Sequence, residues 1–195
     1  MISFKDLAGK LFVLSAIHGM ATTPFGRIAG YLTRHGRETL ETGGTVTAPF
    51  TSGTWQHEVI SVAVLQLLEA WRPNAEPEHL QAVRRAVNLL GDPPPALHAS
   101  PSIEEVACHV VEQCKLHAME ETTTMRLMCY IAIFGASDLH YGGYGVETLA
   151  HPTAAQELIS EAATELWGAV RPNAEDRHGR IMTAKAALLQ IQLVA

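Results

Sequence analysis

A chain of 195 residues, 47% of them hydrophobic, has enough apolar side chains to bury a continuous core, which excludes an intrinsically disordered protein. Its 14 basic and 20 acidic residues give a formal net charge of −6, which argues against a nucleic-acid partner because binding phosphates requires a basic surface. The apolar run from Leu11 to Ile17 is far shorter than the roughly 18 residues that cross a bilayer, so we expect no membrane association.

An internal repeat dominates the sequence. The string RPNAE occurs at residues 72–76 and again at 171–175, an offset of 99. The same offset aligns residues 3–91 with 102–190 without a gap, and 26 of the 89 pairs are identical. We therefore predict two tandem copies of one unit, at 1–91 and 102–195, packed into one helical body. The segment 92–101 between them is rich in proline, which predicts a linker without helix.

The elements can be read twice, once in each copy. Ser3 and Ser102 each precede an apolar-periodic stretch with acidic residues in its first turn, which predicts an N-cap and a first helix of about 16 residues. A second helix is expected at 23–35 and 122–134, ending at Gly36 and Gly135. This pattern also removes a secretory signal as an explanation of the first apolar run, because the same run recurs inside copy 2.

A long connection at 36–53 and 135–152 leads to a third helix. We call residues that are identical between the copies retained, and the retained residues of this helix have helical spacing. A fourth helix is expected from Asn74 to Leu90 and from Asn173 to Leu189, with each asparagine as the N-cap. Four amphipathic helices per copy and no strand-rich stretch predict an all-α fold.

The repeated RPNAE string has two interpretations. Asparagine suits a helix N-cap, proline fixes the approach of the chain, and arginine suits the C-terminus of the preceding helix. We therefore favour a capping turn over a ligand-binding loop. His79 and His178, which follow the string in the two copies, are placed over the first turn of the fourth helix.

A second group of retained polar residues includes an arginine and a tyrosine four positions apart, and a glutamate that opens the third helix. The simpler interpretation is a buried arginine–glutamate pair that joins the second and third helices of each copy. The alternative is a polar pocket that binds an anion or a metal. The candidate pocket residues are His18, Arg27, Tyr31, Glu58, His117, Arg126, Tyr130 and Glu157.

The histidines and cysteines give no strong signature of a metal or cofactor. None of the ten histidines forms an H-E-x-x-H motif, so we predict no metal site and no cofactor. Three cysteines without a C-x-x-C pair suit reduced thiols and a cytoplasmic location. Cys108 and Cys129 stand where copy 1 has Gly9 and Gly30, so we interpret them as small residues at helix contacts rather than nucleophiles.

The copies differ most in charge and in the long connection. The acidic excess lies entirely in copy 2, which has twelve acidic and six basic residues. Aromatic residues on a glycine-rich loop are typical of recognition surfaces, and the alternative is that they only cover the helix ends. The candidate partner surface is Phe50, Trp55, His140, Tyr141 and Tyr144. We hypothesise a non-enzymatic cytoplasmic protein that binds a protein partner or regulates one; an enzyme or a small-ligand or metal-binding protein is the alternative, and homo-oligomerisation is left open.

Overall fold

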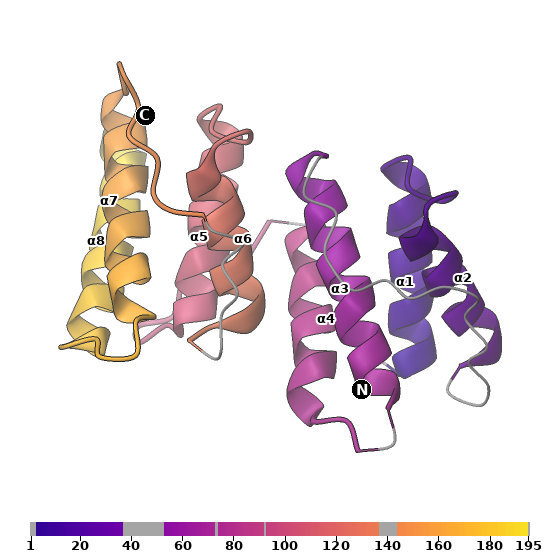
Figure 1. Cartoon of the computed structure of the whole chain (residues 1–195). Coiled ribbons are helices and arrows are strands. Elements are labelled where there is room, and N and C mark those ends of the chain that lie inside the picture. Colours follow the sequence, from indigo (N-terminus) through magenta and orange to yellow (C-terminus); the bar gives the residue numbers. More distant parts are fainter. Residues whose placement is uncertain (1–2, 37–52, 73, 92, 137–143, 195) are drawn as a thin grey trace. The chain divides into compact units, whose positions relative to one another are not determined.

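The computed structural model describes residues 3–36, 53–72, 74–91, 93–136 and 144–194. In these ranges the chain forms eight helices and no strand, which confirms the predicted all-α fold (Figure 1). No helix within these ranges combines the length and apolar character needed to cross a membrane. The chain divides into two compact units, Met1–Asp92 and Pro93–Ala195, and each is described by itself.

Unit 1 contains four helices, which pack as two hairpins: α1 on α2, and α3 on α4. Helix α1 also contacts α3 and α4, so its apolar face lies at the centre of the unit. Leu7, Leu11, Leu32, Ile60 and Leu67 are fully buried in this core. The helices are α1 (Phe4–Ile17), α2 (Pro24–His35), α3 (Trp55–Trp71) and α4 (Pro77–Leu89).

Unit 2 repeats this order with four helices of its own, paired in the same way, and Figure 1 shows α7 and α8 side by side. They are α5 (Ile103–Leu116), α6 (Thr123–Phe134), α7 (Ala154–Ala169) and α8 (Arg177–Val194). The first three begin 99 residues after their counterparts. This matching order supports the duplication inferred from the sequence. The packing of the two copies into one body stays a prediction.

The helix boundaries follow from local chemistry that both units share. The hydroxyl of Ser3 accepts a hydrogen bond from the amide of Asp6, whose carboxylate accepts one in return from Ser3. Ser102 and Glu105 form the same capping box, so both predicted N-caps are confirmed. At the C-termini of α2 and α6, Gly36 and Gly135 have φ of 62° and 67° with ψ near −135°, a region that glycine alone adopts readily.

The predicted N-caps of the fourth helix are wrong. In unit 1, helix α4 begins at Pro77, and the preceding Glu76 makes no capping bond with its side chain. In unit 2, at the start of α8, the carboxylate of Asp176 accepts a hydrogen bond from the amide of Gly179 at 3.0 Å. The asparagines instead belong to turns closed by backbone bonds from Ala75 to Arg72 and from Ala174 to Arg171. The physical reason is that proline is favoured as the first helical residue, which moves the start of α4 past the turn.

The proline-rich segment that was predicted as a linker lies against unit 2. The ammonium group of Lys185 on α8 donates hydrogen bonds to the carbonyls of His98 and Ala99, at 2.7 and 2.9 Å. The ring of His109 on α5 lies 2.7 Å from the carbonyl of Pro95. Residues from Pro93 onward therefore belong to the second compact unit.

Candidate functional site

The retained histidines His18 and His117 hold equivalent places at the C-termini of α1 and α5. Each offers its backbone carbonyl to a side chain that opens the third helix of its unit: Nε2 of His57 lies 2.7 Å from the oxygen of His18, and Nε2 of Gln156 donates to the oxygen of His117 at 2.9 Å. Burial lowers the pKa of His18, with a smaller contribution from the charge of His57. In both units, therefore, a hydrogen bond joins a side chain at the start of the third helix to the backbone carbonyl of the histidine that ends the first helix.

The predicted arginine–glutamate pairs do not form buried bridges. In unit 1, Glu58 is 2% exposed but Arg27 is exposed to solvent. In unit 2 the environments reverse, because Glu157 is exposed and Arg126 is partly buried. A buried pair requires that both partners leave the solvent, so the predicted burial of both partners is wrong in both units.

The retained tyrosines lie on the same face of the second helix in each unit. Tyr31 stacks on His35 with ring centroids 4.5 Å apart, and Tyr130 contacts Phe134 at 6.1 Å. Tyr130 also meets Tyr144 from the long connection at 6.0 Å. Both tyrosines therefore take part in aromatic packing, and Tyr130 joins the predicted pocket set to the predicted partner surface.

The predicted partner surface is only partly described. Phe50, His140 and Tyr141 lie outside the described residues. Trp55 is the first residue of α3 and only 5% exposed, so it packs in the core and is not an exposed recognition residue. Tyr144 is half-buried against Tyr130, which leaves part of its ring accessible.

The end of the long connection is held on α6 in unit 2. The backbone amide of Glu147 donates to the buried hydroxyl of Thr124 at 2.8 Å, and its carboxylate accepts from the amide of Thr123 at 2.9 Å. Negative charge at a helix N-terminus is favourable because the first amides point toward it. The counterparts in unit 1 are Pro24, which has no amide hydrogen, and Phe25, which has no hydroxyl, so neither bond can form there.

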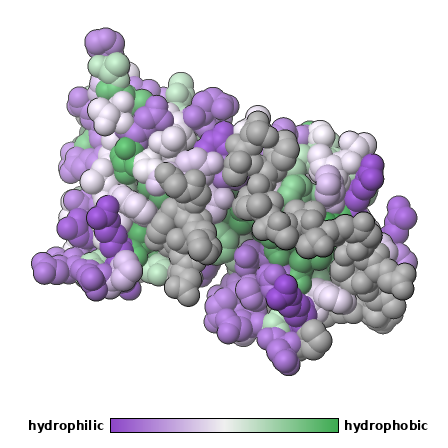
Figure 2. All heavy atoms as spheres, viewed as in Figure 1, coloured by the Kyte–Doolittle hydropathy of each residue, from purple (hydrophilic) through white to green (hydrophobic). Residues whose placement is uncertain are grey.

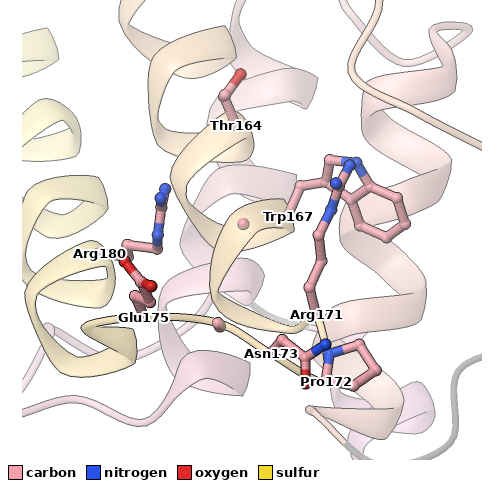
Figure 3. Close-up of a pocket in the computed structure, with 9 residues that line it drawn as sticks. Thr164, Trp167, Arg171, Pro172, Asn173, Glu175 and Arg180 are labelled. Carbon is pink, nitrogen blue, oxygen red and sulfur yellow. The ribbon is translucent and has the colours of Figure 1, made fainter.

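A concave surface in unit 2 lies where α7 turns into α8. This groove has a volume of about 660 Å³ and is open to solvent (Figure 3). The end of unit 2 that carries the turn presents mainly hydrophilic side chains in Figure 2. The residues that line the groove come from the end of α7, the RPNAE turn and the start of α8: Thr164, Trp167, Gly168, Arg171, Pro172, Asn173, Ala174, Glu175 and Arg180.

Two guanidinium groups flank this groove. Figure 3 shows Arg171 beside the indole of Trp167 on one side, with the guanidinium carbon 5.3 Å from the ring centroid, and Arg180 on the other side. Arg180 donates to the carboxylate of Glu165 at 2.9 Å. Gly168 makes this arrangement possible, because a Cβ there would lie 2.7 Å from the terminal nitrogen of Arg180.

In unit 1 an ion pair forms at the start of the corresponding turn. Arg72, the counterpart of Arg171, lies 3.0 Å from the carboxylate of Glu69. Glu69 is replaced by Gly168 in unit 2, which removes the carboxylate and leaves Arg171 on the face of Trp167. Two further replacements complete the change: Leu68 becomes Trp167 and Gln81 becomes Arg180. The RPNAE sequence and one backbone hydrogen bond, from Ala75 to Arg72 and from Ala174 to Arg171, are common to both units, while the side chains around them differ.

The cysteines are poor candidates for nucleophilic chemistry. Burial raises the pKa of Cys114 to about 12, so its thiol stays protonated near neutral pH, and a protonated thiol is a weak nucleophile and a weak metal ligand. Cys129 is 2% exposed, in line with its interpretation as a small residue at a helix contact. Within the described part of the chain, no three histidine, cysteine or acidic side chains group as metal ligands would.

The sequence predicts a turn at RPNAE but not the groove beside it. Trp167, Gly168 and Arg180, which line the groove, are not among the predicted site residues. The available signal was the set of replacements that surround a retained turn: leucine to tryptophan, glutamate to glycine and glutamine to arginine. No family model, curated protein or solved structure matches this chain.

Proposed function

We propose that this chain is a non-enzymatic binding protein, and that unit 2 contacts a protein partner through the groove between α7 and α8. One observation carries the proposal: the same turn ends in an ion pair with Glu69 in unit 1 and borders an open groove with Arg171 and Trp167 in unit 2. A retained sequence motif with changed neighbouring side chains is the pattern expected when one copy of a scaffold acquires its own specificity.

The composition of the groove supports a protein partner. Tryptophan, tyrosine and arginine are the residue types that contribute most often to binding energy at protein interfaces. Trp167 and Arg171 supply two of these types in contact with each other. The partner surface of our sequence hypothesis belongs to the same proposal, with Tyr144 as its described member and His140 and Tyr141 as predicted contacts.

The retained histidine and tyrosine residues fit scaffold roles better than a shared catalytic site. His18 and His117 receive interhelical bonds through their backbones, and Tyr31 packs on a neighbouring ring. A cytoplasmic location and a regulatory role are further parts of the proposal. The location rests on the cysteine count, because three cysteines without a C-x-x-C pair suit a reducing compartment.

Two matched substitutions test this function. Gly168→Glu restores in unit 2 the carboxylate that neutralises Arg72 in unit 1, and it displaces only the flexible end of Arg180. Glu69→Gln removes the exposed ion pair of unit 1 and leaves the groove intact. Wild type and both variants are cross-linked to partners in a lysate of the source organism, and each captured protein is then produced alone and titrated calorimetrically.

We expect Gly168→Glu to weaken binding of the purified partner at least about tenfold, which corresponds to about 1.4 kcal/mol, while Glu69→Gln binds like wild type. Thermal unfolding of both variants checks that the fold is kept. A partner that binds wild type and Gly168→Glu with equal affinity would place the interface elsewhere and refute the proposal.

A further inference from the structure

Resting on that proposed function, we infer that the groove of unit 2 recognises an acidic segment of the partner protein. One aspartate or glutamate carboxylate of the segment pairs with the guanidinium of Arg171, and a neighbouring apolar residue packs on the wall formed by Trp167, Pro172 and Ala174. Asn173, exposed at the same rim, offers an amide to the backbone of the segment.

The placement of Arg171 favours a carboxylate. Its guanidinium carbon lies 5.3 Å from the centroid of the Trp167 ring, and a guanidinium presents its N–H groups as a fork that matches two carboxylate oxygens. Stacking on Trp167 also restricts the side chain before binding, which reduces the entropy lost on association. Within the part of the chain that the structure describes, no carboxylate pairs with Arg171, because Gly168 stands where Glu69 pairs with Arg72.

The charge around the groove selects a monoanion over a phosphoryl group. Arg180 is already paired with Glu165, and Glu175 adds a negative charge to the lining. Among the residues that line the groove, Arg171 therefore supplies most of the positive charge that is not already paired. A phosphorylated residue carries about −1.5 to −2 charges at neutral pH, so it would be repelled more strongly than a carboxylate.

The openness of the groove favours a segment over a free small molecule. Sites for small ligands usually enclose them, covering about 70–90% of the ligand surface. A groove of about 660 Å³ that is open to solvent would leave a small acid largely hydrated. A segment that crosses it adds apolar contact with Trp167 and Pro172 to the charged pair, and both contacts act together.

Nuclear magnetic resonance of the full chain tests this inference, with the indole N–H of Trp167 as the reporter, assigned by Trp167→Phe. The probes are acetyl-Leu-Glu-Leu-amide, its glutamine analogue, its phosphoserine analogue and sodium acetate. We expect the glutamate peptide to shift the reporter with saturation and its glutamine analogue to bind about tenfold more weakly, since a charge-assisted pair is lost. Gly168→Glu should weaken the glutamate peptide by a similar factor, and Glu69→Gln should not.

Three results would overturn the inference: equal affinity for the glutamine analogue, tighter binding of the phosphoserine analogue, or an equal response to acetate at the same concentration. The two proposals fail separately. If a partner is captured in a manner sensitive to Gly168→Glu but the glutamate peptide gives no response, acidic-segment recognition is wrong and the proposed function stands. If the peptide binds but no partner depends on the groove, the proposed protein partner is wrong and carboxylate recognition stands.

Discussion

The connection between the first two helices of each unit allows a reciprocal test of backbone strain. In unit 1, Gly19 follows α1 with a φ of 72°, its amide donates to Ala16, and the next amide, of Met20, donates to Ser15. In unit 2 the same place is held by Ala118 with a φ of 56°, followed by a matching bond from Met119 to Cys114. This is the glycine-favoured end of a Schellman motif, and only unit 1 has glycine there.

The magnitude follows from two opposing terms. A left-handed backbone costs an L-residue about 1–2 kcal/mol, whereas glycine loses about 0.4–1 kcal/mol more conformational entropy on folding. Gly19→Ala should therefore lower the free energy of unfolding by about 0.5–1 kcal/mol, and Ala118→Gly should raise it by the same amount. No atom lies within 4 Å of a Cβ placed on Gly19, so steric overlap adds nothing to the first value.

Thermal and urea unfolding followed by circular dichroism measure both changes. A difference of 1 kcal/mol shifts the midpoint of a unit of 60–100 residues by about 4–8 °C, so each variant should move by about 2–8 °C, in opposite directions. Gly145→Ala is the control, because this glycine has no positive φ and no atom within 4 Å of the added Cβ. A lowered midpoint for Ala118→Gly would refute the strain argument.

Three further results are expected. Burial lowers the pKa of His18 below its ordinary 6.5, so the unfolded chain takes up this proton at a higher pH than the folded chain. The free energy of unfolding should therefore fall as the pH drops below about 6.5. His18→Gln should reduce that fall in thermal melts recorded at several pH values. In native protein, iodoacetamide should modify half-buried Cys108 well before Cys114, whose thiol burial keeps protonated; mass spectrometry that finds equal rates would contradict this. Thr124→Val removes the buried acceptor of the Glu147 amide and should cost about 1–3 kcal/mol in urea unfolding, and an unchanged midpoint would mean that the bond contributes nothing.

The helices were predictable because their boundaries depend on residues close in sequence. The Ser3 and Ser102 caps act three residues ahead, and Gly36 and Gly135 end helices through their own φ angles. The start of the fourth helix was misjudged for the same local reason, since Pro77 competes with Asn74 for the role that begins a helix, and the fixed φ of proline prevailed.

The site required the tertiary structure. We predicted a buried pair of Arg126 with Glu157 because both residues are retained between the copies, but burial depends on which faces the packed helices cover, and Glu157 is exposed. Likewise, an aromatic residue next to a glycine-rich loop suggested exposure for Trp55, whose ring is buried.

By itself the sequence determined the all-α class, the repeated order of helices and the turn that both copies keep, because these depend on local periodicity, capping and identity between copies. Only the tertiary structure decided what the turn does in unit 2. It brought Arg180 from α8 over Gly168, across the groove from Arg171 and Trp167, and the separation of Arg180 from these residues in the sequence carries no signal of proximity. A groove is a property of packed surfaces, and so it followed from the fold rather than from any motif.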